Sequence, residues 1–189
     1  KAAGLGVTNF NYPRIPKPKL NKHVDVLVVG AGPSGLTAAL SVAMDTELQV
    51  LIVDENHQAG GSLAYDRAGL DTQFFEMEEL LAKIGKAKNI TLQLNAYASS
   101  YYTDHLIPIV EETGITKVRA KTLIVATGAF EQPPVFRNND LPGVVNGSAA
   151  QRLIYRFATK PFFKGVVFTA NDYGYRVAKD LIKAGVEVS

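Results

Sequence analysis

A glycine-rich segment carries the strongest chemical signal in this sequence. Gly30, Gly32 and Gly35 have the spacing G-x-G-x-x-G, with Pro33 and Ser34 between the last two. The first glycine permits a tight turn, the second lets the backbone approach a diphosphate, and the third lets a helix pack closely against a strand. Pro33 suits a first helical turn, whose free N–H groups and partial positive charge favour an anion. The segment therefore predicts a site for the pyrophosphate of a dinucleotide.

An acidic pair follows at the separation that such a site requires, about 20 residues further on. The pair is Asp54 and Glu55, at the end of an apolar run. A carboxylate at this place accepts hydrogen bonds from an adenosine ribose and repels a 2′-phosphate. We expect Asp54, the first residue past the apolar run, to be the ribose acid. The pair favours NAD, FAD or another adenine nucleotide over NADP; the alternative is a glycine turn beside a solvated acid.

Two further glycine sites narrow the type of fold. Gly60-Gly61-Ser62 follows the acidic pair within one short loop, and Ala126-Thr127-Gly128 ends a later apolar run. They resemble the secondary fingerprints of the glutathione-reductase-like flavoproteins, in which both loops lie close to the bound dinucleotide. Ordinary turns are the alternative interpretation of both sites.

The elements that must position these residues are recognisable in the pattern. Residues 24–29 and 50–53 are apolar runs of the kind found in strands buried on both faces, and residues 33–44 form a helical stretch between them. Strand, helix and strand in about 30 residues make a βαβ unit with parallel strands.

The middle of the chain changes its periodicity. A helix is predicted over residues 72–86 and a short strand over 91–94. Period-two segments separated by turn residues predict an antiparallel β-meander, and a buried strand follows over residues 123–126. The three meander strands are expected at residues 97–102, 105–110 and 115–119.

A second βαβ unit lacks the phosphate signature. After a helix at 148–157, we predict a strand at 166–168, a helix at 173–183 and a strand at 186–188. The phosphate-loop positions read Thr169-Ala170-Asn171-Asp172-Tyr173-Gly174, so two of the three glycines are replaced by residues with side chains. Asn171 or Asp172 is better explained as a helix N-cap. We therefore expect this unit to be structural and to bind no dinucleotide.

Composition excludes several classes of function. The chain has 189 residues, is 47% hydrophobic and 20% charged, and carries a net charge of only +2, which does not suit nucleic-acid binding through a basic face. Without cysteine it has no disulfide, iron–sulfur or thiol chemistry. No apolar run approaches the roughly 18–20 residues needed to cross a membrane. We expect no membrane segment and a cytoplasmic location.

No catalytic set emerges from the pattern. His23, His57 and His105 are scattered, and none has a carboxylate or nucleophile at a spacing typical of a dyad or metal site. We therefore assign no catalytic residue, expect no metal, and interpret His57 as a loop residue.

Three regions are expected along the chain. Residues 1–22, with three prolines between positions 13 and 18, predict an extended linker from a missing upstream domain. Residues 23–160 are expected to form an FAD/NAD-binding domain. Residues 161–189 are interpreted as the start of a second, degenerate βαβ domain that is cut short, so the sequence is taken as part of a longer protein.

Several segments resemble the alpha subunit of heterotetrameric sarcosine oxidase, with relatives in dye-linked proline dehydrogenases and in opine and hydrogen-cyanide-forming oxidases. The resemblance rests on the segments at residues 3–6, 126–136, 139–144 and 167–172. It implies an α/β fold: a glutathione-reductase-like, Rossmann-type parallel sheet with an inserted antiparallel β-meander, plus the truncated second βαβ unit. It also implies that one NAD or other adenine nucleotide is held through the glycine loop, with looser adenine contacts from backbone near Ala96 and Tyr97.

The resemblance further implies where the oxidation takes place. The substrate-oxidising flavin would lie on a partner beta chain, with a second flavin near the subunit boundary. Our leading hypothesis is a dinucleotide-binding part, holding NAD or FAD, of a multisubunit flavin-dependent amine or amino-acid oxidoreductase. The alternative is a non-catalytic scaffold that holds an adenine nucleotide. A self-sufficient disulfide or NADH oxidoreductase is disfavoured, because cysteine is missing and the second glycine loop is degenerate.

Overall fold

The computed structural model describes residues 11, 16–44, 46–67 and 71–189, with the backbone alone for 71–75. The segment at residues 3–6 and most of the expected linker therefore lie outside the described residues. Within those ranges, no helix is both long and apolar enough to cross a membrane.

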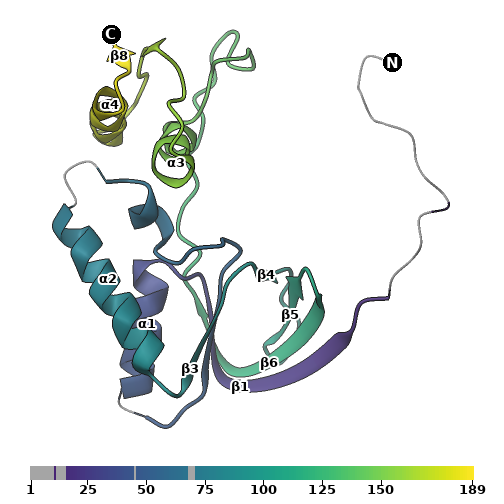
Figure 1. Cartoon of the computed structure of the whole chain (residues 1–189). Helices are drawn as coiled ribbons and strands as arrows, with labels where there is room; N and C mark the ends of the chain where they lie inside the picture. Colours follow the sequence, from purple (N-terminus) through teal and green to yellow (C-terminus); the bar gives the residue numbers. More distant parts are fainter. Residues whose placement is uncertain (1–10, 12–15, 45, 68–70) are drawn as a thin grey trace.

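A six-stranded sheet, in the order β3-β2-β1-β6-β5-β4, forms the frame of the molecule (Figure 1). β3, β2, β1 and β6 are parallel, and β5 and β4 continue the sheet in antiparallel fashion. The strands are β1 (Lys19–Val29), β2 (Val50–Val53), β3 (Ile90–Gln93), β4 (Tyr97–Ala98), β5 (Leu106–Glu111) and β6 (Gly114–Val125). This is the expected parallel sheet with an antiparallel meander.

The two faces of the sheet bury separate cores, because successive side chains of a strand point to opposite faces. On one face, Val26 and Val28 pack against α1 (Pro33–Met44) and α2 (Asp71–Lys86). On the other, Leu27 packs beneath the meander with Ile107 and Ile109. Figure 1 shows the two helices on one side of the sheet and β4 and β5 on the other. Each such aliphatic side chain contributes about 1.5–3 kcal/mol when buried.

The longest strands depart from the sequence prediction. β6 is one strand of 12 residues, where two strands at 115–119 and 123–126 were expected. It pairs with β5 over its first part and with β1 over nearly its whole length. β1 starts at Lys19, so residues 19–22, expected in the linker, are paired strand instead. In Figure 1 these two strands sweep together from the helical side to the meander.

The first meander strand is shorter than predicted. Of residues 97–102, only Tyr97–Ala98 form β4, and Tyr102 makes a single bridge to Leu106. The predicted helices agree closely, since two match their expected limits, at 33–44 and 173–183, and two start one residue earlier.

The second unit is small and has its own core. It contains β7 (Lys164–Gly165), α4 (Tyr173–Lys183) and β8 (Glu187–Val188), and it packs against α3 (Gly147–Phe157), the helix that precedes it. β7 and β8 pair in parallel apart from the main sheet. Ala150 of α3 and Val177 of α4 are among the buried residues of this separate core. The strand expected at 166–168 lies earlier, at Lys164–Gly165, because the pairing with β8 ends at Gly165.

Candidate functional site

The sequence-predicted site residues meet at one edge of the parallel sheet. The Gly30 amide donates to the Val53 carbonyl at 2.8 Å, and the Ala126 amide donates to the Val29 carbonyl at 2.8 Å. The chain segments that follow β2, β1 and β6 are therefore neighbours. In open α/β sheets, the carboxyl ends of the strands are where ligands bind.

The fold does not require glycine equally at the three glycine positions of the first loop. A Cβ at Gly30, whose φ is +109°, would lie 2.2 Å from the Ala126 carbonyl oxygen, and one at Gly35 would lie 2.0 Å from the Gly30 carbonyl oxygen. Both positions require glycine for the chain to close upon itself. At Gly32, a Cβ would meet only the Gly61 Cα among the described atoms, at an ordinary 3.7 Å. The fold itself therefore leaves room for a Cβ at Gly32. A ligand lying against this stretch of backbone would need the same space.

At the start of α1, two backbone amides make no hydrogen bond to the described residues. The Leu36 amide donates to the Gly32 carbonyl at 3.0 Å, which closes the first turn. The amides of Ser34 and Gly35 precede this bond, where a helix supplies no acceptor, and Pro33 has no N–H to leave unpaired. An anion can accept from these groups.

The second glycine loop lies directly against the first. The Gly60 amide donates to the Ala31 carbonyl at 2.8 Å. A Cβ at Gly61, whose φ is +57°, would lie 2.9 Å from the Gly32 Cα. Ser62 is exposed in the short 3-10 helix η1 (Gly61–Ala64) that follows. At the end of β6, Thr127 and Gly128 are exposed as well, next to the turn at Gly30.

The acidic pair divides into a fixed and a free carboxylate. Asp54 Oδ2 accepts from the Ala31 amide at 2.7 Å, and Oδ1 accepts from the backbone and side-chain amides of Asn56, both at 2.8 Å. Each carboxylate oxygen has two acceptor positions, so Oδ2 keeps capacity for one more donor. Glu55 is exposed and makes no hydrogen bond in the part of the chain that is described.

The loop expected near an adenine lies beside the acid. The Ala96 amide donates to the Asp54 carbonyl at 2.9 Å, and the Asn95 amide donates to the Asn56 carbonyl at 3.0 Å. Ala96 is buried, whereas the Tyr97 side chain is 53% exposed. The Ala96 amide is therefore committed to the protein, which leaves the Ala96 carbonyl and the exposed Tyr97 for a ligand.

An arginine pair on α3 reaches the same end of the site. Arg156 Nη1 donates to Asn56 Oδ1 at 2.9 Å, and the guanidinium carbons of Arg152 and Arg156 lie 4.8 and 5.1 Å from the centre of the Tyr65 ring. Burial, followed by the nearby Arg152 charge, lowers the pKa of Arg156. Sequence reasoning missed Asn56, Tyr65 and both arginines; the i,i+4 spacing of the arginines was the available signal.

The phosphate-loop positions of the second unit are filled by protein. A Cβ at Gly174 would lie 2.3 Å from the Thr169 Cγ2, so the Thr169 side chain occupies the approach. Asn171 Oδ1 accepts from the Tyr173 amide at 3.0 Å. Asp172 occupies the N-cap position of α4 without a side-chain capping bond to the described residues. These contacts agree with a structural role for this loop.

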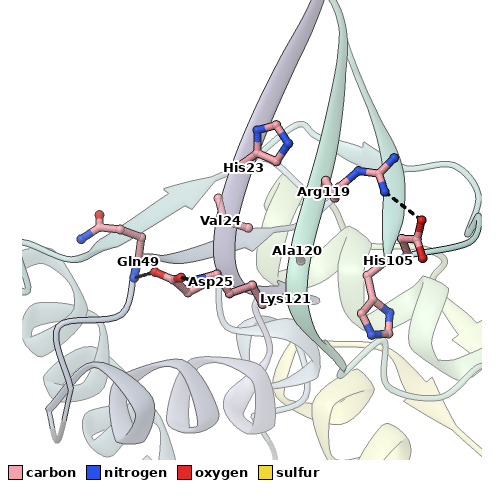
Figure 2. A pocket seen from close by; sticks show the side chains of 9 residues that line it. His23, Val24, Asp25, Gln49, His105, Arg119, Ala120 and Lys121 are labelled. Atoms are coloured by element: carbon pink, nitrogen blue, oxygen red, sulfur yellow. Dashed lines mark hydrogen bonds and ion pairs between the residues drawn. The ribbon is translucent and has the colours of Figure 1, made fainter.

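A separate groove lies away from the glycine loop. This groove has a volume of about 560 Å³ and is lined in part by Asp25, Arg119 and Lys121 (Figure 2). Lys121 and Asp25 form an ion pair at 2.7 Å, and Arg119 and Asp104 form another at 3.1 Å. The groove includes the middle of β1 and Gln49, ahead of β2, so it lies towards the amino-terminal ends of these strands. The hydrogen bond from Lys121 lowers the pKa of Asp25. The described residues contain no group of three or more His, Asp or Glu side chains that could hold a metal ion.

Comparison with known proteins gives one family and several relatives. The profile described as pyridine nucleotide-disulphide oxidoreductase matches residues 24–188. The sarcosine oxidase alpha subunits of Rhizobium meliloti (strain 1021) and Corynebacterium sp. (strain P-1) are 31% and 33% identical over 100% and 96% of this chain. In both cases the chain spans 21% of the relative's length. An opine oxidase subunit of Agrobacterium tumefaciens (strain Ach5) is 26% identical over 88% of this chain and 36% of its own.

Solved structures agree with the fold. L-proline dehydrogenase from P. horikoshii superposes with a TM-score of 0.80 and 25% identity, over 94% of this chain and 37% of its own. An NAD-dependent persulfide reductase from A. fulgidus has a TM-score of 0.64 at 23% identity, over 87% of this chain and 33% of its own, a likeness of fold alone. The expected resemblance to sarcosine oxidase alpha subunits and the expected fold class are both confirmed.

Proposed function

Since the chain belongs to the pyridine nucleotide-disulphide oxidoreductase family, we propose that it is the dinucleotide-holding part of a flavin-dependent oxidoreductase of amines or amino acids. One observation carries the proposal: Gly32 has no structural need to be glycine, yet it lies between the start of α1 and the second glycine loop. A bound pyrophosphate supplies the reason for a glycine there.

Each part of the site has a role in holding NAD or FAD. The amides of Ser34 and Gly35 bind the diphosphate, and Asp54 accepts from the ribose hydroxyls with its remaining Oδ2 position. Glu55 adds negative charge that repels a 2′-phosphate. Backbone near Ala96 and the exposed Tyr97 border the adenine. The remaining loop residues line the path of the dinucleotide: Gly30, Gly60, Gly61, Ser62, Thr127 and Gly128.

The bound dinucleotide supplies the redox chemistry, and this chain supplies orientation and electrostatics. The relatives are named as subunits, so we propose that substrate oxidation takes place on a partner flavoprotein beta chain within a larger assembly. We take residues 23–160 as the dinucleotide domain and residues 161–189 as part of a second domain that binds no dinucleotide.

The identity of the bound nucleotide can be tested by releasing it from the purified chain. The chain is purified and denatured, and the supernatant is analysed by absorbance and mass spectrometry. A flavin spectrum identifies FAD, and a nicotinamide mass identifies NAD. ATP or ADP alone would instead favour a non-catalytic scaffold. A chain that neither carries nor takes up any adenine nucleotide contradicts the proposal.

The ribose contact is tested at the acidic pair. Asp54→Ala removes a charged acceptor, and we expect it to weaken ADP binding by about 1–3 kcal/mol in isothermal titration. Glu55→Ala is the matched control, because it removes the neighbouring exposed charge without breaking a hydrogen bond to the described residues. A larger loss for Glu55→Ala than for Asp54→Ala would move the ribose contact to Glu55.

A further inference from the structure

A chain of hydrogen bonds joins α3 to the glycine loop through the ribose acid. Arg156 Nη1 donates to Asn56 Oδ1 at 2.9 Å, and Asn56 Nδ2 donates to Asp54 Oδ1 at 2.8 Å. The Ala31 amide donates to Asp54 Oδ2 at 2.7 Å. Three segments far apart in the sequence therefore share one polar network, and Asp54 is held at both of its oxygens.

The Arg156 end of this network is itself fixed in place. The guanidinium lies over the Tyr65 ring, with its carbon 5.1 Å from the ring centre. The Tyr65 amide donates to the Ser62 carbonyl at 3.1 Å, so the ring is anchored on the second glycine loop. Arg156 Nε is buried and has no hydrogen-bond partner among the described residues. Leaving such a donor unpaired is costly, and among the described residues the stacking on Tyr65 and the hydrogen bond to Asn56 are the contacts that hold this guanidinium.

We propose that Arg156 is a positioning residue for ribose recognition: by holding Asn56, it keeps the Asp54 carboxylate turned for a sugar hydroxyl. The inference rests on the proposed function, because it assigns a determinant of that same site. An Asn56 side chain released from Arg156 can rotate, and Asp54 then loses one of the donors that fix Oδ1. A carboxylate with more freedom must be ordered again when the sugar binds, which lowers affinity.

Arg152 provides a matched control on the same helix. It lies one turn before Arg156, and its guanidinium carbon is 4.8 Å from the centre of the same Tyr65 ring. Its Nη2 donates to the Tyr65 hydroxyl at 3.3 Å, and no bond to Asn56 is found within the described part of the chain. Arg152→Ala therefore removes an equal charge and a similar stacking contact while leaving the network to Asp54 intact.

The test compares ADP with 2′-deoxy-ADP by isothermal titration of the full chain. The ratio of the two affinities reports the sugar contact, and a general loosening of the fold weakens both ligands alike. We expect Arg156→Ala to weaken ADP binding roughly tenfold and to bring the ratio close to one. Arg152→Ala should keep the wild-type ratio. Arg156→Lys, which retains a donor, should restore part of it.

Asn56→Ala breaks the same network without touching the Tyr65 stack, so it serves if Arg156→Ala does not fold. It too should lower the ratio, and the double variant should lose no more than either single variant. An unchanged ratio in Arg156→Ala or in Asn56→Ala overturns the role of Arg156. Failure of the wild-type chain to bind ADP at all overturns the proposed function instead, so the two failures are distinguishable.

Discussion

At the scale of single residues, glycines of one motif serve unlike purposes. Gly30 and Gly35 are fixed by collisions within the chain, at 2.2 and 2.0 Å for an added Cβ. Gly32 would meet only an ordinary 3.7 Å contact among the described atoms. A sequence motif cannot separate these cases, because its letters are the same whether the neighbour is protein or ligand.

This difference predicts that folding and binding can be separated at Gly32. We expect Gly32→Val to abolish ADP binding while the melting temperature stays near that of the wild type, because the side chain fills ligand space. Gly85→Val, in α2 with no described atom within 4 Å of its Cβ, is the control for a valine in a helical or near-helical segment. Undiminished ADP binding by folded Gly32→Val would remove the basis for the pyrophosphate site.

At the scale of elements, α3 is capped from a distance. Glu131 Oε1 and Oε2 accept from the amides of Gly147 and Ser148 at 2.9 and 2.8 Å. The N-cap residue, Asn146, makes no side-chain capping bond to the described residues. A carboxylate at a helix N-terminus accepts hydrogen bonds from the free amides and interacts favourably with the positive end of the helix dipole. Glu131 thus ties the loop after β6 to the helix that carries Arg156.

We therefore expect Glu131→Ala to lower the free energy of unfolding by about 0.5–2 kcal/mol, the range for a lost N-cap. Urea denaturation followed by circular dichroism measures the change. Asp172→Ala is the matched control, since Asp172 sits at the N-cap of α4 without a side-chain capping bond to described residues. An equal decrease in the free energy of unfolding in the two variants would show that the Glu131 hydrogen bonds do not stabilise α3.

At the scale of the whole molecule, a buried polar network joins the second unit to the first. Gln151 Nε2 donates to Asp180 Oδ2 at 2.7 Å and to Asp66 Oδ1 at 3.3 Å, and Arg176 pairs with Asp66 at 2.5 Å. Asp66 and Asp180 are 6% and 1% exposed. Tyr155 donates to Asp180 Oδ1 and Tyr173 donates to Gln151 Oε1, both at 2.5 Å. Because the partners come from α3, α4 and the loop after η1, the network fixes how these three segments meet.

This network predicts a pH dependence of stability. Burial raises the pKa of Asp66 above its ordinary value of 3.8, with Arg176 opposing the shift. As pH rises through 3.8, Asp66 ionises in the unfolded chain before it does so in the folded one, so its contribution to stability falls until the folded pKa is passed. Over that pH interval, the melting temperature of Asp66→Asn should rise relative to that of the wild type. A difference independent of pH would contradict the raised pKa.

Much of the fold could be predicted because its signals are local. The helices at 33–44 and 173–183 and the strand at 50–53 have the expected limits, since apolar periodicity and the glycine and proline positions mark them directly. The extents of β1 and β6 could not be predicted. Residues 19–22 are polar apart from Leu20 and carry no strand pattern, and they are strand only because β6 pairs with them.

The parallel βαβ core, the glycine loop with its acid, and the loss of phosphate space in the second unit could all be inferred from the amino-acid order, because each depends on residues close together in the chain. Two features became visible only in three dimensions: Gly32 is free of steric demand, and Arg156 reaches Asp54 through Asn56. Contacts between segments up to 100 residues apart depend on how the strands and helices pack, and that packing leaves no local pattern in the sequence.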